Sequence, residues 1–543
     1  ATLDDIASDG EQSAPETPTE KALASIVSSI LQREHIGIDD RFFEIGGDSL
    51  KAIRVVARAR TTFEVPIGLD DIFAHQTIHR LAALIDSQSP DGGSSSVTSL
   101  GGPGEYVVAP VQESLLDIEG RYLPQQRAAF NRNDQFMITG PLDHALLRQA
   151  MQVMMARHET LRSTFDTHRR LQIVHPAGAM DPQLTVHDLQ QHLDSQTELE
   201  RLVQERLLNP FDIAEEPLVR ADLFTLAPEQ HVLLTAMHQL ISDAISAGVF
   251  HSELQRIYEC LVENRAVDLP PLEVQYKETA LSRRNHLAGR RPELESYWAA
   301  YLDGAEPRTP LSKSKARPRR ASLRGHRLVS VVPDDLTAGL SALSQRLGVT
   351  DFIVAETVIG QMLLEKTGRS EVLMGTYTSG RLDLSSQHQI GCYASAIPRR
   401  FRVNSGPISA FLQQNQRDLV TAVQHAELPY ADSLAALQWV RGVDSTPQFD
   451  VMISYDTATE GDLTTAGGGA TFTAVPLPRF AKEGDVHIAW VRWPDRLEIA
   501  ITYTDDLFTA SDIHDLMDAT YRSMERLLNH ANSQAHTQED QHV

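Results

Sequence analysis

Two short segments hold side chains whose types and spacing suit chemistry. The first, FFEIGGDSL at Phe42–Leu50, places Ser49 behind two glycines and an aspartate, where a helix is predicted to begin. A phosphodiester on that serine would lie at the positive end of a helix dipole. The second, MHQLISDAIS at Met237–Ser246, puts His238 between a predicted strand and a predicted helix, with Asp243 nearby. A histidine at a strand end beside a carboxylate suits a general base and its orienting partner.

Both segments also have purely structural interpretations. An Asp or Ser before a helix most often only caps it, and a single His at a strand end is more often a hydrogen-bonding residue of the interior. A metal site is not predicted, because no second His or carboxylate stands at ligand spacing on the element that carries His238. From the residues alone, both interpretations stay open.

Composition argues against two classes of partner. The 543-residue chain carries 73 acidic and 49 basic residues, a net charge of −24 that repels phosphate backbones. Its basic run Lys313–Arg320 fits an exposed loop better than a nucleic acid interface. No stretch approaches the ~18 consecutive apolar residues of a membrane span. We therefore expect neither a nucleic acid nor a membrane partner.

Cysteine usage and the start of the chain indicate where the protein acts. The two cysteines, Cys260 and Cys392, exclude a disulfide framework and fit the reducing cytoplasm. The first 20 residues lack the basic and apolar regions of a targeting peptide. They also lack an initiator Met, from which we expect a piece cut from a longer chain.

A linker divides the chain into a small and a large unit. Ser, Gly and Pro fill 13 of the 18 positions from Ser87 to Gly104, the composition of a flexible connection. Upstream, a capping box at Thr17–Glu20 and apolar residues at helical spacing predict three or four short helices, one of them beginning at Ser49. Downstream, helical and strand patterns interleave, which predicts two α/β lobes with a cleft between them. The predicted helices of the large unit cover 142–158 and 246–261, and its predicted strands cover 231–237, 329–332, 371–377, 449–455, 486–490 and 497–503.

The small unit resembles the peptidyl carrier (thiolation) domain of nonribosomal peptide synthetases. The resemblance rests on IGIDDRFFEIGGDSLKAI at Ile36–Ile53, with its Gly-Gly-Asp-Ser-Leu centre. It implies that Ser49, preceded by Asp48, carries a covalent 4′-phosphopantetheine arm whose thiol holds an aminoacyl or peptidyl group. It outweighs the capping interpretation, and under it Phe42 and Phe43 are expected in the core.

The large unit, from Tyr106 to Asn532, resembles a condensation domain of the same enzymes. The segments that carry this resemblance are, in order, ARHETLRSTF, YKETALSRR, GTYTSGRLDL, IGCYASAIPRRF, HAELPYADSL and RGVDSTPQFDVMISYD. The resemblance implies two lobes of the chloramphenicol acetyltransferase type arranged in a V, with the active site in a tunnel between them. It also implies that Asp243 pairs with Arg381 of the GTYTSGR segment and braces the turn across the lobes.

The hallmark of that family, His-His-x-x-x-Asp-Gly, is altered here. Aligned on Asp243, the chain supplies His238 and then Gln239, where the family has the histidine credited with proton handling. Three explanations stay open: a substitution made to hold a loaded substrate, a natural enzyme that works by positioning, or a catalytically silent domain that recruits a partner. A carboxamide takes no proton but can hydrogen-bond an amine or an oxyanion. Loss of a general base typically costs on the order of 10²- to 10⁴-fold in rate, which leaves room for residual activity.

The sequence therefore predicts a multidomain protein, an all-α carrier bundle followed by an α/β condensation domain. The predicted boundaries are 1–86 for the carrier, 87–105 for the linker, 106–272 and 273–532 for the two lobes, and 533–543 for a disordered tail. The catalytic candidates are His238, Gln239, Asp243 and Arg381, and the cofactor-binding candidates are Ser49 and Asp48.

The predicted reaction is amide formation between a donor on the Ser49 arm and an amine on a downstream acceptor carrier. The implied partners are a phosphopantetheinyl transferase, an adjacent adenylation domain and aminoacyl or peptidyl thioesters. The chain has no G-x-x-x-x-G-K-[ST] loop, so ATP-dependent activation is expected elsewhere. Two alternatives remain: an epimerisation domain, which also follows a carrier, and a non-catalytic platform that recruits a separate enzyme.

Overall fold

The computed structural model describes residues 13–539 outside a set of gaps. The gaps are Gln32, Glu34, Glu44, Asp48, Pro66, 89–99, Pro307, Pro310, 312–314, 319–321, Leu323, 382–383, Ser405, Tyr430, 434–448, 459–463, Gly468, Pro476 and 478–483. The side chains of some other residues, Ser49 among them, also lie outside the described part. The cofactor-binding candidate Asp48 is therefore not placed.

Four helices form the first unit, as the apolar spacing predicts. They are α1 (Pro18–Leu31), α2 (Ser49–Phe63), α3 (Leu69–Ala74) and α4 (Ile78–Ser87). Their apolar faces share one core, built around residues such as Leu23, Val55, Ile67 and Leu81. Phe42 and Phe43 are buried in it edge to face, with ring centroids 5.1 Å apart, so their predicted place in the core is confirmed.

The capping box predicted at the start of α1 is present. The Thr17 backbone N–H donates to Glu20 Oε2 at 3.0 Å, and the Glu20 N–H donates to Thr17 Oγ1 at 3.1 Å. The His79 ring, from α4, lies 2.9 Å from Glu20 Oε1. The Thr17 N–H first, and then His79, lower the pKa of Glu20 to about 2. This carboxylate therefore ties the first helix of the bundle to the last.

Acid is expected to loosen α1 through Glu20. Because the folded pKa lies below the ordinary value of 4.5, the contribution is present above that pH and is lost as the pH falls toward 2. Hydrogen exchange of residues 18–31 in the full chain, measured between pH 5 and 2, should show this loss. Glu20→Gln, which keeps the acceptor without the charge, should remove the pH dependence, whereas Glu20→Ala should lower protection at every pH. An unchanged profile for Glu20→Gln would contradict the assignment.

The first lobe of the large unit is built on a six-stranded sheet. Four of its strands are β2 (Asn131–Thr139), β7 (Gln230–His238), β6 (Val219–Ala227) and β5 (Gln183–Asp188), adjacent in that order. Helices α6 (His144–Arg157) and α8 (Ala244–Val262) cover one face, and α7 (Ser195–Leu207) covers the other. A small antiparallel sheet, β1 (Gly104–Val107), β4 (Leu171–Val174) and β3 (Ser163–Asp166), completes the lobe together with α5 (Pro110–Glu119), η2 (Pro124–Phe130) and η3 (Glu159–Arg162).

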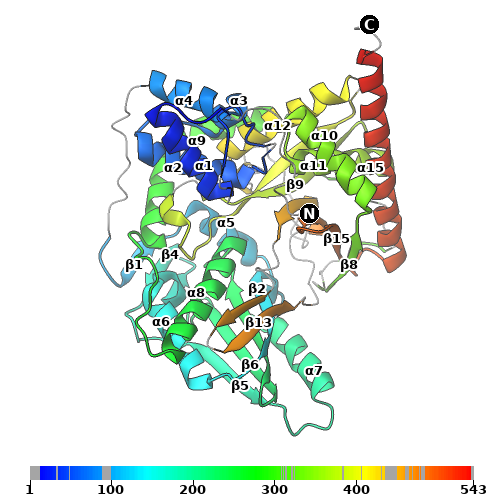
Figure 1. The fold of residues 1–543 in the computed structure, drawn as a ribbon. Helices are drawn as coiled ribbons and strands as arrows, with labels where there is room; N and C mark the ends of the chain where they lie inside the picture. The colour runs from blue at the N-terminus through cyan, green and yellow to red at the C-terminus, as the bar shows by residue number, and fades with distance from the viewer. Residues whose placement is uncertain are drawn as a thin grey trace.

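The second lobe repeats the plan with a second six-stranded sheet. Its strand order is β10 (Ser395–Arg402), β9 (Glu371–Thr378), β11 (Phe449–Thr457), β14 (Gly484–Arg492), β15 (Leu497–Thr504) and β8 (Gly325–Val331). Helices α10 (Asp334–Leu347), α11 (Asp351–Thr367), α12 (Ile408–Gln424) and α15 (Ala510–Glu539) pack on one face in a common core. Between the lobes in sequence runs α9 (Tyr276–Leu302). Figure 1 shows the carrier bundle in blue beside the second lobe, and α15 in red along its outer side.

The predicted boundary between the lobes is wrong in one respect. Strands β12 (Thr464–Gly467) and β13 (Ala470–Val475) belong by sequence to the second lobe but extend the sheet of the first. β13 pairs antiparallel with β2, with Phe472 opposite Ile138. Phe472 is buried in the first-lobe core beside Tyr258. Covering the open edge of β2 and burying this ring explain the exchange.

The two segments predicted to be irregular, the linker 87–105 and the tail 533–543, are each ordered at one end. At the C-terminus, α15 continues to Glu539 where a disordered tail from 533 was expected. Ala531 is buried there, and Gln534 Oε1 accepts from the Ile408 N–H at 3.0 Å, so tertiary contacts extend the helix. In the linker, Leu100 N–H donates to Glu278 Oε1 at 3.1 Å. The rest of both segments, 540–543 and 89–99, lies outside the described residues.

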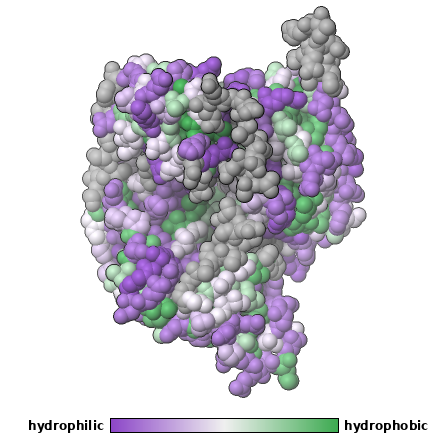
Figure 2. All heavy atoms as spheres, in the orientation of Figure 1, coloured by the Kyte–Doolittle hydropathy of each residue, from purple (hydrophilic) through white to green (hydrophobic). Residues whose placement is uncertain are grey.

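Hydrophilic residues dominate the visible face of the molecule, with apolar residues in scattered patches (Figure 2). Among the described residues, no single helix is long and apolar enough to cross a membrane. Helices α10 and α11 taken together are long and apolar enough, but they are bent by 115° relative to each other. The apolar composition of α11 follows from its place in the second-lobe core.

Candidate active site

The altered motif lies in the turn between β7 and α8. β7 ends at His238, and Asp243 caps α8 by accepting from the Ser246 N–H at 2.7 Å. The Gln239 N–H donates to Phe130 O at 2.8 Å, which holds the turn against the end of η2. The pattern of an apolar strand, a polar turn and a helix therefore folds as predicted.

Asp243 and Arg381 form the ion pair that the resemblance implies. Arg381 Nη2 donates to Asp243 Oδ1 at 3.0 Å, and Asp243 Oδ2 accepts from the Tyr393 N–H at 3.1 Å. Both charged side chains are almost fully buried. Asp243 comes from the first lobe, and Arg381 and Tyr393 come from the second. This carboxylate therefore joins the two lobes at the motif.

Arg381 is held by more groups than sequence reasoning identified. Its Nη1 donates to Gln389 O at 2.9 Å and also to Ser386 O, and its Nη2 donates to Ser246 Oγ at 2.7 Å. Its guanidinium also stacks on the Tyr393 ring, 4.0 Å from the ring centre. We call Asp243, Ser246, Arg381 and Tyr393 the interlobe clasp.

Gly391 permits the close approach of the segments around the clasp. Its N–H donates to Ser246 Oγ at 3.0 Å, and its carbonyl accepts from the same hydroxyl at 2.8 Å. A methyl group at this position would lie 2.1 Å from the Tyr276 ring. Only glycine therefore fits here. Ser246 and Tyr393 lie inside the segments that sequence analysis singled out, but only the fold shows that they meet.

His238 points into the interior of the first lobe. Its side chain is 1% exposed, its Nδ1 accepts from the Leu240 N–H at 3.2 Å, and its Nε2 faces Glu119 Oε1 at 3.5 Å. The ring also stacks on Phe130. These contacts give His238 the role of a buried residue that shapes the turn. Its partner Glu119, at the end of α5, has no sequence signal that links it to the motif.

Gln239 is half-buried beside this buried histidine. Its carboxamide offers two N–H donors and one acceptor oxygen, and it does not take up a proton near neutral pH. At this position the site can therefore orient a polar substrate group but cannot remove a proton from it.

The carrier helix lies close to the loop that holds the clasp. Ser49 is the first residue of α2, and α2 contacts η4 (Leu384–Ser386), whose Ser386 carbonyl accepts from Arg381. A second contact lies at Gly348, where a methyl group would stand 3.2 Å from Arg41 Nη2 and 3.3 Å from Gln76 Oε1. The carrier therefore packs on the second lobe, with α2 against a loop of the candidate site.

The start of α2 suits a phosphate ester. Its first turn holds no acidic side chain, so within the helix itself no carboxylate offsets the N–H groups and the positive end of the helix dipole. Lys51 lies in the same turn, and its Nζ donates to Gly46 O at 2.8 Å. These residues fit a phosphopantetheine group on Ser49, which would supply a flexible arm with a terminal thiol.

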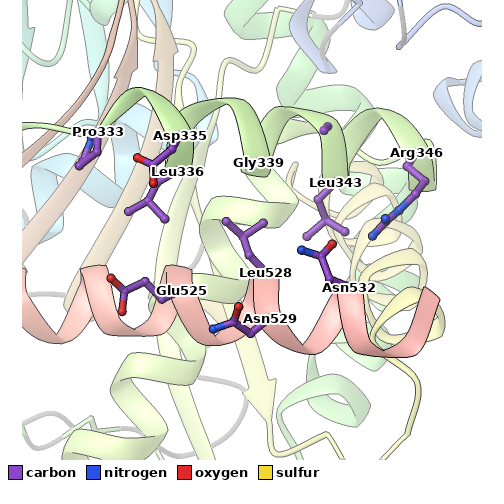
Figure 3. Close-up of a pocket in the computed structure, with 11 residues that line it drawn as sticks. Pro333, Asp335, Leu336, Gly339, Leu343, Arg346, Glu525, Leu528, Asn529 and Asn532 are labelled. Atoms are coloured by element: carbon purple, nitrogen blue, oxygen red, sulfur yellow. The ribbon is translucent and has the colours of Figure 1, made fainter. Parts of the chain in front are cut away.

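A separate groove lies between α10 and α15 (Figure 3). Its volume is about 540 Å³, and leucines line it together with charged and amide side chains such as Asp335, Arg346, Glu525 and Asn529. It belongs to the outer helical layer of the second lobe and contains none of the candidate residues. Within the described part of the chain, no group of three or more His, Cys, Asp or Glu side chains is arranged to hold a metal ion.

A helical bundle with a serine at a helix start, docked on two clasped α/β lobes, defines a carrier joined to an acyl-transfer domain. The chain belongs to the condensation domain family, which matches residues 103–540, and residues 21–85 match the phosphopantetheine attachment site family. It combines a carrier domain and a condensation domain of the nonribosomal peptide synthetase type, and the sequence-based assignment is confirmed. Covalent 4′-phosphopantetheine is the cofactor of its first domain.

The curated relatives that this chain matches are much longer than the chain itself. A linear gramicidin synthase protein from Brevibacillus parabrevis is 30% identical over 450 residues, which cover 81% of this chain and 9% of that protein. Among solved structures, the X-domain complexed with OxyB from teicoplanin biosynthesis matches at TM-score 0.70 and 22% identity, over 80% of this chain and 96% of that one. A four-domain nonribosomal peptide synthetase bound to AMP and glycine matches at TM-score 0.70 and 17% identity. The match covers 81% of this chain and 34% of that chain. Both structural matches establish the fold.

Proposed function

We propose that this chain joins a donor acyl group, held on Ser49, to an amine presented by a separate acceptor carrier. The observation that carries the proposal is the contact of α2 with η4, because it brings the helix that begins at Ser49 to the loop around Arg381. A C–N bond forms to the donor carbonyl carbon, and the C–S bond breaks with its electron pair going to the sulfur of the arm. The amine loses one proton, and the thiolate of the arm takes one up, so the products are an amide and a free thiol.

In this proposal Gln239 positions the acceptor amine. An α-amine has a pKa of about 8, so part of it is neutral at pH 7 and can attack without a base. Holding two reactants in attack geometry can supply several kcal/mol of rate enhancement. The carboxamide oxygen can accept from the amine, and the backbone bond to Phe130 keeps residue 239 in place. Asp243 and Arg381 hold the turn and do not exchange protons.

The proposed reaction requires other proteins, and it implies where in the cell the chain acts. A phosphopantetheinyl transferase would load Ser49, an adenylation domain would supply the activated donor, and the acceptor would arrive on a downstream carrier. Cys260 and Cys392 are both buried and free, in keeping with a cytoplasmic site of action.

Intact mass spectrometry of the full chain tests the proposal. Ser49 is loaded with a dipeptidyl phosphopantetheine arm, an aminoacylated acceptor carrier is added, and both masses are followed with time. The donor should leave this chain and appear on the acceptor, while Ser49→Ala should never load. A donor that stays in place would contradict the proposal. Inversion of the Ser49-bound residue without any acceptor would support epimerisation instead.

Two observations favour a second candidate, a non-catalytic platform. Gln239 removes the proton-handling side chain, and one structural match is an X-domain complexed with OxyB. A platform would bind a separate enzyme that acts on the donor while Ser49 holds it. It predicts no transfer in the mass assay and recovery of a soluble enzyme with the loaded chain. Amide product without any such enzyme would exclude it.

A further inference from the structure

A serine and a histidine are hydrogen-bonded on the second-lobe sheet, outside the motif. Ser454 Oγ, on β11, lies 3.1 Å from His487 Nε2, on β14. Asp456 Oδ2, 3.3 Å from the same hydroxyl, is the alternative acceptor for its single proton. The Tyr377 ring, on β9, stands edge-on to the His487 ring at 6.4 Å. We call Tyr377, Ser454, Asp456 and His487 the sheet-face cluster.

The cluster lies on the face of the sheet that the outer helices do not cover. Val486, Ile488 and Trp490 of β14 point into the core under those helices. Side chains alternate along a strand, so His487 points the other way, and Ser454 follows the same rule beside Ile453. Part of this opposite face is covered among the described residues. Leu302, at the end of α9, packs there with Leu373, Phe449 and Met452. Arg317 pairs with Asp485 on the same face of β14. Ser454 and His487 are accordingly only half-buried.

The strands beneath the cluster lead toward the first lobe. β9 ends at Thr378, one residue after Tyr377, and Arg381 then reaches Asp243. β11 ends at Thr457, three residues after Ser454, and the next strand, β12, already belongs to the first-lobe sheet. The two strands are parallel neighbours, with Met452 opposite Gly375. The cluster therefore stands close to where the chain crosses between the lobes, on the face opposite the outer helices.

A hydroxyl hydrogen-bonded to an imidazole can relay a proton. Imidazole is the side chain that changes charge between about pH 5 and pH 8 without any perturbation. The hydroxyl can take a proton on its oxygen while its own proton passes to the ring nitrogen. Asp456 then remains within reach of the Ser454 hydroxyl. The carboxamide of Gln239, in the motif turn, cannot act in this way.

We propose that His487 takes up, through Ser454, the proton that the acceptor amine releases during amide formation. As the amine proton moves to Ser454 Oγ, the serine proton moves to His487 Nε2, and the resulting imidazolium later loses its proton to solvent. His487 is thus a proton acceptor from the second lobe that replaces the base missing at residue 239. The inference rests on the proposed amide-forming function.

Single-turnover amide formation by the loaded full chain, measured from pH 5 to 9, tests the inference. His487→Asn should slow transfer by about 10-fold or more and remove a step from the pH profile. Ser454→Ala, which removes only the hydroxyl group, should also slow transfer and remove the step from the pH profile. Among the described residues, the charged or titratable groups on this face around His487 come from four elements. They are Tyr377, Asp456, Arg327 on β8 beyond the cross-strand neighbour Thr502, and Asp485 with its ion-pair partner Arg317. His326→Asn, on the exposed edge strand β8, is the matched control and should change nothing.

The outcomes separate the two proposals. If the parent chain transfers its donor and both variants keep its rate and pH profile, the relay is wrong and the amide-forming function stands. If the parent chain transfers nothing, both are wrong. If Ser454→Ala alone slows transfer and the pH profile keeps its step, Ser454 acts by positioning and His487 is not the acceptor. Hydrogen exchange of β11 and β14 in each variant shows whether the sheet is intact.

Discussion

Replacing Gln239 by His is expected to speed amide formation by about 10²-fold. The new imidazole would stand at the position that the family uses for proton handling. The gain should fall at the lower end of the range for a general base because the relay through His487 already removes part of the barrier. The substitution should disturb the turn little. The hydrogen bond from the backbone N–H of residue 239 to Phe130 O and the buried His238 both hold the turn and do not involve the side chain at position 239.

The same mass time course measures this gain. Gln239→Met, of similar length but without hydrogen-bonding groups, is the control and should lose the positioning effect. In a Gln239→His background, His487→Asn should cost little, because the proton then has a direct acceptor. Equal rates for the parent and Gln239→His would mean that positioning suffices. Transfer by the His variant alone would mean that Gln239 is a disabling change.

Local patterns predicted the elements that are determined locally. The capping box at Thr17–Glu20 and the helix that begins at Ser49 both rest on residues within one helical turn of each other. The pairing of Asp243 with Arg381 spans 138 residues and came from the family resemblance, not from spacing. The geometry of this ion pair could be expected only because the same resemblance also predicts the fold.

Long-range contacts without a local pattern were not predictable. His238 meets Glu119 because α5 packs against the turn after β7, where Gln112 Nε2 donates to Leu240 O at 2.7 Å, and nothing in either segment encodes that meeting. The exchange of β13 into the first-lobe sheet depends on an open edge at β2, a property of the folded sheet. The contact of Ser454 with His487 follows from the parallel register of β11 and β14, which neither strand specifies alone.

Removal of Arg381 should cost the most stability of any single change considered. Arg381→Ala would leave the Asp243 carboxylate, 6% exposed, without its charged partner. It would also leave the Gln389 carbonyl and the Ser246 hydroxyl short of a donor in the interior. Breaking one side of a buried ion pair typically costs about 3–5 kcal/mol. Arg381→Lys should be intermediate, because an ammonium group cannot reproduce the planar fork or the stack on Tyr393.

Urea unfolding followed by hydrogen exchange in both lobes measures this loss. Arg201→Ala is the matched control, because Arg201 pairs with Glu198 and Glu205 on the exposed surface and its removal should leave the stability almost unchanged. Because the clasp joins the lobes, the Arg381 variants should lose protection first in α8 and β10, the elements that flank it on either side. A loss for Arg381→Ala no larger than that for Arg201→Ala would show that the lobes are held together elsewhere, with the exchanged strands β12 and β13 as the next candidates.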